Sequence, residues 1–180
     1  RLEAVFTVDE ETGMDGARAI DLSRCRGRRM LNLDSEDEGI FLTSCAGGAR
    51  IRGSLPVNRR EVEGTQYDIL IGGLQGGHSG GEIHKERGNS NCLAGRLMWE
   101  CRKVMGLHLL SMEGGLADNA IPRQTRLAVV VPEGEADALK VTVRRIEEAI
   151  RAELAVKDPG VYIDIEEKEK GRFWTLREED

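Results

Sequence analysis

The 180-residue sequence has no uninterrupted apolar run near the roughly 20 residues that a membrane helix needs, and no signal-peptide pattern at its start. It also lacks an excess of positive charge: 26 basic and 32 acidic side chains give a formal charge of -6, and aromatic residues make up only 4%. A basic surface interleaved with aromatic side chains, which nucleic-acid binding favours, is missing. We therefore expect a cytoplasmic protein that binds neither membranes nor nucleic acid, and metal or cationic ligands fit the acidic balance better.

Several common motifs are missing as well. Cys25, Cys45, Cys92 and Cys101 form no C-x-x-C pair, so neither a zinc knuckle nor a redox motif is indicated, and we expect reduced, mostly buried thiols. The glycine-rich stretch GGLQGGHSGG matches no phosphate-binding loop, and its Ser79 is not in G-x-S-x-G. The chain begins at Arg1 and runs directly into LEAVFTV, so we expect it to be a fragment of a longer protein.

Two successive patterns divide the chain. Residues 1–48 alternate strand, short helix and strand in LEAVFTV, DGARAIDL and RRMLNL, which is typical of an α/β unit. In residues 49–180 we predict an α+β unit, an antiparallel sheet with two helices on one face. Its strands are RIRGSLPVNRREV and TQYDILIGGL, paired as a hairpin that turns at Gly64, then LHLLSME, RLAVVVP and VYIDIEE, whereas the tail KEKGRFWTLREED shows no clear element.

The two helices of the second unit follow from apolar spacing. Leu93, Leu97, Cys101 and Val104 share one stripe of the first helix, with Asn89 or Ser90 available as its N-cap. In the second helix the apolar positions run at three- and four-residue spacing from 139 to 154. Core packing is the expected use of both stripes.

Two acidic clusters follow apolar runs. In VDEETGMDG, Glu10 and Glu11 are adjacent, and adjacent side chains of an extended segment point to opposite sides. One carboxylate could then bind a cation while its neighbour takes a proton from a bound water, although a solvated acidic loop is an alternative. In NLDSEDEG, Asp34 comes first after the apolar run, the spacing is not that of an EF-hand, and a charged surface turn is the alternative.

Three histidines are the remaining candidates. His78 lies between two glycine pairs in GGHSGG, where a loose backbone leaves the imidazole free to reach a ligand. A loop imidazole that is satisfied locally explains the same residues equally well. His108, within LHLLSM, is interpreted as structural, and the role of His84 stays open.

Taken together, EETGMDG, LNLDSEDEG, CAGG, LQGGHSGGEIHKERGN and DNAIPR, in this order, resemble the aminoacyl-histidine (Xaa-His) dipeptidase family, of the zinc exopeptidase clan that includes carboxypeptidase G. The resemblance runs from about Val8 to Arg123. It implies that residues 1–48 are part of a catalytic domain that holds two divalent metal ions, expected to be zinc. Residues 49–180 would be part of a lid domain that closes over a small peptide substrate.

The resemblance also implies residue roles. Glu10 would be the general base that activates a water, while Glu11 and Asp34 would each bind one zinc ion. His78 would reach the scissile carbonyl and stabilise its oxygen as it becomes negative, and Asn119 would bind polar groups of the substrate. The implied reaction is metal-dependent hydrolysis of dipeptides of the Xaa-His type.

Alternatives stay open beside this interpretation. The family's other metal ligands, which include a histidine-x-aspartate motif, are not in this chain, so we expect the 180-residue piece alone to be inactive. Another amide-cleaving exopeptidase or deacylase of the clan, or a non-catalytic module that pairs through an exposed strand edge, would also fit. Several clan members swap the lid histidine across a dimer interface, so a homodimer is a further expectation.

Overall fold

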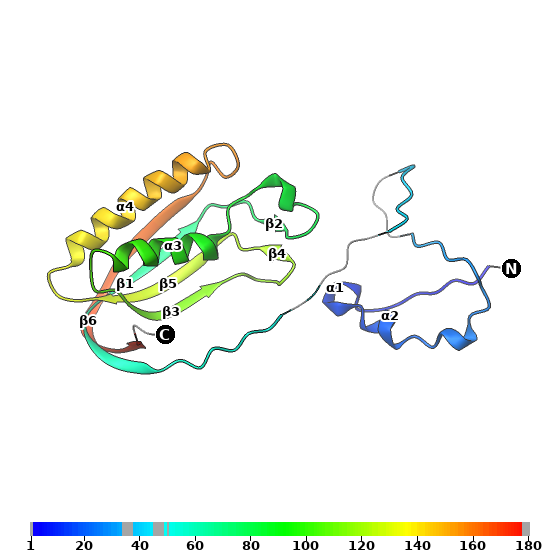
Figure 1. The fold of residues 1–180 in the computed structure, drawn as a ribbon, viewed down its shortest axis with the longest axis horizontal. Coiled ribbons are helices and arrows are strands. Elements are labelled where there is room, and N and C mark those ends of the chain that lie inside the picture. Colours follow the sequence, from blue (N-terminus) through cyan, green and yellow to red (C-terminus); the bar gives the residue numbers. More distant parts are fainter. Residues whose placement is uncertain (1, 34–37, 45–48, 50, 178–180) are drawn as a thin grey trace. The chain divides into compact units, whose positions relative to one another are not determined.

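The structure, a computed structural model, describes residues 2–33, 38–44, 49 and 51–177. The chain divides into residues 1–53, called unit 1, and residues 54–180, called unit 2 (Figure 1). The assignment of catalytic and lid roles to the two parts of the chain remains a prediction.

Unit 1 contains the short helices α1 (Glu10–Gly13) and α2 (Asp15–Ala19) and the 3-10 turn η1 (Leu22–Arg24). The strands predicted at LEAVFTV and RRMLNL are not formed, and the described part of unit 1 contains no strand. A strand needs a hydrogen-bonded neighbour and a covered apolar face. Here the large apolar side chains lack cover, because seven of them are at least 83% exposed: Leu2, Phe6, Met30, Leu31, Leu33, Phe41 and Ile51.

Unit 2 is built on a four-stranded antiparallel sheet (Figure 1). Its order is β3-β5-β1-β6, formed by β3 (His108–Gly114), β5 (Thr125–Val131), β1 (Arg59–Gly72) and β6 (Tyr162–Leu176). The helices α3 (Ser90–Arg102) and α4 (Ala136–Glu153) pack against each other and against the same face of the sheet. This arrangement confirms the predicted α+β unit. Among the described helices, none is long and apolar enough to cross a membrane.

The core lies between this face and the two helices. Alternate strand residues and the helical stripes meet there, as the apolar spacing predicted. Each fully buried aliphatic side chain contributes roughly 1.5–3 kcal/mol to folding. The core includes the following side chains, each at most 3% exposed: Tyr67, Ile69, Ile71, Leu97, Cys101, Leu127, Val129, Val131, Leu139, Val143, Ile146 and Ile150. Of the predicted stripes, only Val104 is exposed, because α3 ends before it.

The hairpin predicted to turn at Gly64 is wrong, because β1 is one continuous strand of 14 residues. Gly64 stands opposite Gly171 of β6, and a Cβ on Gly64 would lie 2.5 Å from the Val131 carbonyl oxygen. The glycine therefore allows a close approach of β5 rather than a turn.

The tail KEKGRFWTL forms the second half of β6, which is an edge strand of the sheet. This half carries exposed charged side chains at Lys168, Glu169, Lys170 and Arg172. Charged edges oppose pairing with another chain, so this edge does not favour the alternative of an edge-strand interaction module.

The described cysteines differ in burial. Cys101 is buried in the core, and burial raises the pKa of its thiol to about 11. Cys25 is partly exposed and Cys92 is exposed, so the expectation of mostly buried thiols is wrong for this pair. Cys45 lies outside the described residues.

Candidate functional site

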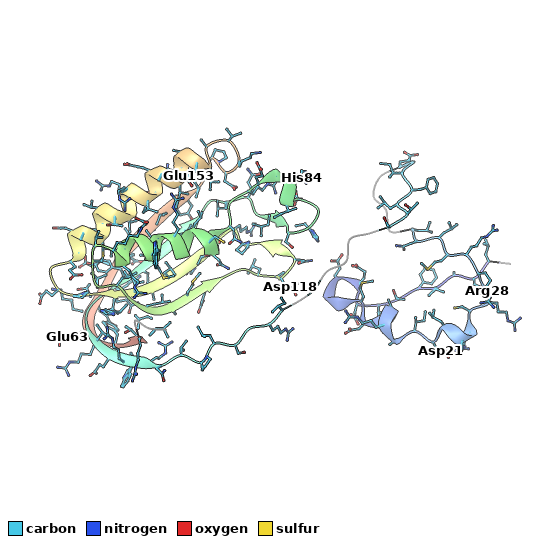
Figure 2. All side chains as sticks on the ribbon, viewed as in Figure 1. Asp21, Arg28, Glu63, His84, Asp118 and Glu153 are labelled. Atoms are coloured by element: carbon cyan, nitrogen blue, oxygen red, sulfur yellow. The ribbon has the colours of Figure 1, made fainter. Side chains whose placement is uncertain are left out.

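A groove of about 660 Å³ lies at one end of unit 2. It lies beside a small two-stranded ladder of β2 (Gly77–His78) and β4 (Ala120–Ile121), at the end that carries His84 and Asp118 in Figure 2, whereas Glu63 marks the other end. The polar and charged side chains that line the groove come from three stretches of the chain: Gln75, His78, Glu113, Asn119, Arg123 and Arg126. Gln124 lines it as well, and two of these seven residues, His78 and Asn119, are those that the family resemblance singled out.

The ladder brings His78 and Asn119 together. In its register Gly77 faces Ile121 and His78 faces Ala120. The Ser79 backbone N–H donates to the Asn119 carbonyl oxygen at 2.8 Å. Asn119, the residue before β4, is therefore joined through its carbonyl to the residue that follows His78, and the side chains of His78 and Asn119 are both exposed.

The imidazole of His78 is held by the glycines that follow it. Its Nδ1 accepts hydrogen bonds from the backbone N–H groups of Gly80 and Gly81, each at 3.0 Å. A ring nitrogen that accepts carries no proton, so the neutral ring has its proton on Nε2. The GGHSGG loop therefore presents an N–H donor rather than an acceptor, which suits an oxygen on which negative charge develops. The prediction that a loose backbone leaves the imidazole free is therefore corrected, because Gly80 and Gly81 hold its Nδ1.

Glu82 ties the loop together around His78. Its Oε2 accepts from the His78 backbone N–H at 2.9 Å, while its Oε1 binds Lys85 Nζ at 2.5 Å and lies 3.4 Å from Arg87 Nη1. The same Arg87 nitrogen donates to the Gly76 carbonyl oxygen at 2.5 Å. The Lys85 hydrogen bond, followed by that from the His78 amide, lowers the pKa of Glu82 to about 2, so its carboxylate is charged at neutral pH.

Gly77 is where this cluster needs a glycine. Its φ is +143°, in the region that side chains with a Cβ rarely adopt. A Cβ there would lie 2.6 Å from Glu82 Oε2 and 2.7 Å from Arg87 Nη1. The glycine before His78 therefore lets the ion pair approach the backbone.

A buried carboxylate, Asp158, closes the base of the loop. It is 0% exposed, and its Oδ1 accepts from the Gln75 N–H at 2.7 Å while its Oδ2 accepts from the Gly88 N–H at 2.6 Å. One side chain thus joins the two ends of the segment 75–88. In the sequence, Asp158-Pro159-Gly160 has only the composition of a turn, and no local pattern indicates that this aspartate is buried.

The predicted metal-site residues lie in unit 1 or outside the described residues. Glu10 and Glu11 occupy the first turn of α1 and are exposed, so the prediction that they lie on an extended segment is wrong. Asp34 lies outside the described residues. Among the residues that are described, no three His, Cys, Asp or Glu side chains are close enough to hold a metal ion. The two carboxylates have suitable donor chemistry, but by themselves they do not make a zinc site.

The other two histidines lie elsewhere. His84 is exposed in the 3-10 turn η2 (Ile83–Lys85) and does not line the groove. His108 is buried at the start of β3, with its Nδ1 3.4 Å from Arg60 Nη2, which agrees with a structural role.

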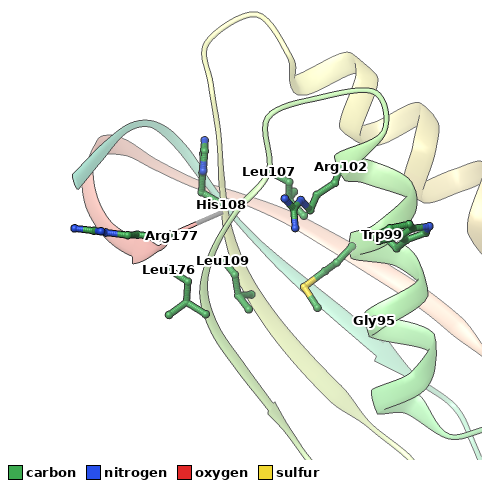
Figure 3. Close-up of a pocket in the computed structure, with 9 residues that line it drawn as sticks. Gly95, Trp99, Arg102, Leu107, His108, Leu109, Leu176 and Arg177 are labelled. Carbon is green, nitrogen blue, oxygen red and sulfur yellow. The ribbon is translucent and has the colours of Figure 1, made fainter. Parts of the chain in front are cut away.

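A second hollow, of about 260 Å³, contains no predicted site residue. Figure 3 shows that side chains of α3, β3 and the end of β6 line it. Its walls are mainly apolar, with Trp99, Leu107, Leu109 and Leu176 among them. The groove beside His78, with its convergent polar groups, is therefore the better candidate for chemistry.

Comparisons with known proteins point to one class. No protein-family model matches the chain. Over 164 residues it is 36% identical to the cytosol non-specific dipeptidase of Escherichia coli (strain K12), covering 90% of this chain and 34% of that protein. The crystal structure of aminoacylhistidine dipeptidase from Vibrio alginolyticus matches with a TM-score of 0.72 at 31% identity, covering 96% of this chain and 35% of that chain. The chain thus spans about a third of the length of both relatives.

The sheet and two helices of unit 2 therefore form a lid-type α+β domain of the dipeptidase fold. Both matches support the assignment of the chain to the Xaa-His dipeptidase family. A hydantoinase/carbamoylase family amidase from Burkholderia multivorans covers 63% of this chain and 29% of its own, at 15% identity and a TM-score of 0.45, which is too distant to inform function.

Proposed function

We propose that the whole protein hydrolyses dipeptides, with unit 2 as a lid that closes over the substrate. The observation that carries this proposal is the groove shared by His78 and Asn119, in which His78 presents an Nε2–H donor. Substrates with a C-terminal histidine are proposed from the family alone. By analogy with the relative named a cytosol dipeptidase, we also propose a cytoplasmic location.

The groove suits a peptide with a scissile carbonyl and a free C-terminus. His78 would donate from Nε2 to the carbonyl oxygen as negative charge develops on it, which is worth on the order of 3 kcal/mol in a partly dried site. The Asn119 amide can both donate to and accept from the substrate's polar groups. Arg123 and Arg126 line the same groove, and a guanidinium pairs well with a terminal carboxylate.

For the metal centre we propose Glu11 and Asp34 as ligands of two divalent ions, expected to be zinc, and Glu10 as the general base. Further ligands are required, since the described residues contain no cluster that could hold an ion. Bound zinc would supply a water whose pKa is lowered toward neutrality. Glu10 would take the proton of the attacking water and return it to the leaving amine.

Replacing Glu10 by glutamine in the full-length protein is expected to lower kcat for Xaa-His dipeptides at least about 100-fold. The amide keeps the shape of the side chain but cannot take a proton, so bound metal, measured by atomic absorption, should stay at the wild-type level. Asp15→Asn removes a neighbouring exposed carboxylate and serves as the control. Near-normal turnover of Glu10→Gln would remove the base assignment.

The substrate class is tested on the same preparation. Xaa-His dipeptides, other dipeptides, tripeptides and N-acyl amino acids are compared by kcat/KM. Fastest hydrolysis of dipeptides is expected, and a preference for tripeptides or N-acyl substrates would favour the alternative of another amide-cleaving member of the clan. The 180-residue polypeptide assayed alone should be inactive, because it carries too few metal ligands.

A homodimer is the proposed assembly, in which His78 could serve its own or the partner's active centre. Mixing His78→Ala chains with Glu10→Gln chains distinguishes the two, because partial recovery of activity requires that His78 act across the interface.

A further inference from the structure

We propose that Glu82 is a positioning residue, which holds the loop around His78 so that the imidazole Nε2–H faces the groove. The kinetic part of this inference rests on the proposed function. Its structural part concerns the tautomer and orientation of His78 and stands independently of any activity.

The contacts of Glu82 reach both sides of His78. Its Oε2 binds the His78 amide directly, and its Oε1 is shared by Lys85 and Arg87, the second of which binds the Gly76 carbonyl oxygen. The Glu82 backbone N–H also donates to the His78 carbonyl oxygen at 3.1 Å. A single residue thus fixes the backbone before, at and after the histidine.

The turn that Glu82 closes is the one that sets the tautomer. Residues 78–82 fold back so that the Gly80 and Gly81 N–H groups converge on Nδ1. If the carboxylate is removed, the His78 amide loses its acceptor and Lys85 and Arg87 lose their shared anion. The two glycine amides are then free to move away, because glycine restricts the backbone least. The ring is left to sample both tautomers and other rotamers.

The positioning role differs from a catalytic one in its geometry. Glu82 does not line the groove, and both of its oxygens are engaged by loop residues. It therefore acts through His78 rather than on the substrate. The Cβ that Gly77 lacks would collide with this carboxylate and with Arg87, so the loop is shaped around the contact.

The test measures the His78 ring in the full-length protein by long-range ¹H–¹⁵N NMR, with its signal assigned by its loss in His78→Ala. In the wild type, His78 is expected to show an unprotonated Nδ1 and a protonated Nε2. In Glu82→Ala, averaging between tautomers is expected, together with a fall of about tenfold in kcat and little change in KM. Glu82→Gln, whose amide oxygen can still accept from the His78 N–H, should recover part of both.

The matched control is Glu86→Ala, which removes a carboxylate from the same loop. Glu86 lies 3.4 Å from Lys157 with its side chain 76% exposed, so the wild-type tautomer and kcat should be kept. A wild-type tautomer and kcat in Glu82→Ala would overturn the proposal. If circular dichroism shows that Glu82→Ala does not fold, wild-type values of both readouts in Glu82→Gln would overturn it instead. Averaged tautomers with unchanged kcat would leave the structural part standing and refute the role of His78 in the proposed function.

Discussion

Replacing His78 by alanine in the full-length protein is expected to lower kcat for dipeptide hydrolysis at least about 100-fold, while KM changes little. The reason is that the Nε2–H bond to the carbonyl oxygen strengthens only as negative charge develops. A loss of 100-fold corresponds to about 2.7 kcal/mol of transition-state stabilisation. Steady-state kinetics on an Xaa-His dipeptide measure both constants.

His84→Ala is the matched control for this prediction. His84 is an exposed histidine six positions further along the same loop, but it does not line the groove. We expect its variant to keep kcat within about twofold of the wild type. Equal losses in the two variants, or a large rise in KM without a fall in kcat for His78→Ala, would show that the imidazole does not act on the transition state.

Replacing Asp158 by alanine is expected to lower the free energy of unfolding by about 3 kcal/mol. The carboxylate accepts hydrogen bonds from the Gln75 and Gly88 N–H groups, and Gly88 is buried, so the variant would remove the acceptor of both donors. Unfolding in urea, followed by circular dichroism, measures the difference.

Two further variants make this test specific. Asp158→Asn keeps one acceptor oxygen and turns an NH₂ toward the other backbone N–H, so a smaller but clear loss is expected. Asp164→Ala removes an exposed carboxylate from β6 and should change stability by less than about 0.5 kcal/mol. If Asp158→Ala cost no more than Asp164→Ala, the two hydrogen bonds would not anchor the loop.

Much of unit 2 could be predicted from local pattern. The apolar spacing of the sequence predicts both helices. Asn89 was a candidate N-cap of α3, and its side chain accepts from the Asn91 and Cys92 N–H groups at 3.0 and 3.2 Å. Leu127, Val129 and Val131 likewise alternate along RLAVVVP, and all three are buried. These features depend on residues close in the sequence, for which periodicity is a sufficient guide.

Features that depend on distant residues could not be predicted. Gly64 fits a turn by its residue type, and only the three-dimensional structure shows that β5 passes close to it. Asp158 fits a turn in the same way, and only the structure shows that it binds both ends of the segment 75–88. In unit 1 the apolar runs have the composition of strands. No described neighbour pairs with them, so composition alone predicted a structure that is not formed there.

The candidate site likewise combines features that the sequence indicates with features that only the structure shows. GGHSGG alone left a functional and a satisfied histidine equally plausible, and only the resemblance joined His78 to Asn119. The ladder of β2 and β4 then supplies the geometry, and the network of Glu82 is visible only in three dimensions. The roles of Glu10, Glu11 and Asp34 stay predictions.

The most direct test of the account is a crystal structure of the full-length protein with a phosphinic dipeptide analogue, in which a phosphinyl oxygen stands for the charged carbonyl oxygen. The account predicts that His78 Nε2 lies within about 3.2 Å of that oxygen, with Glu10, Glu11 and Asp34 gathered on the opposite side of the phosphorus. A His78 ring that faces solvent in that complex, with the three carboxylates far from the inhibitor, would contradict it.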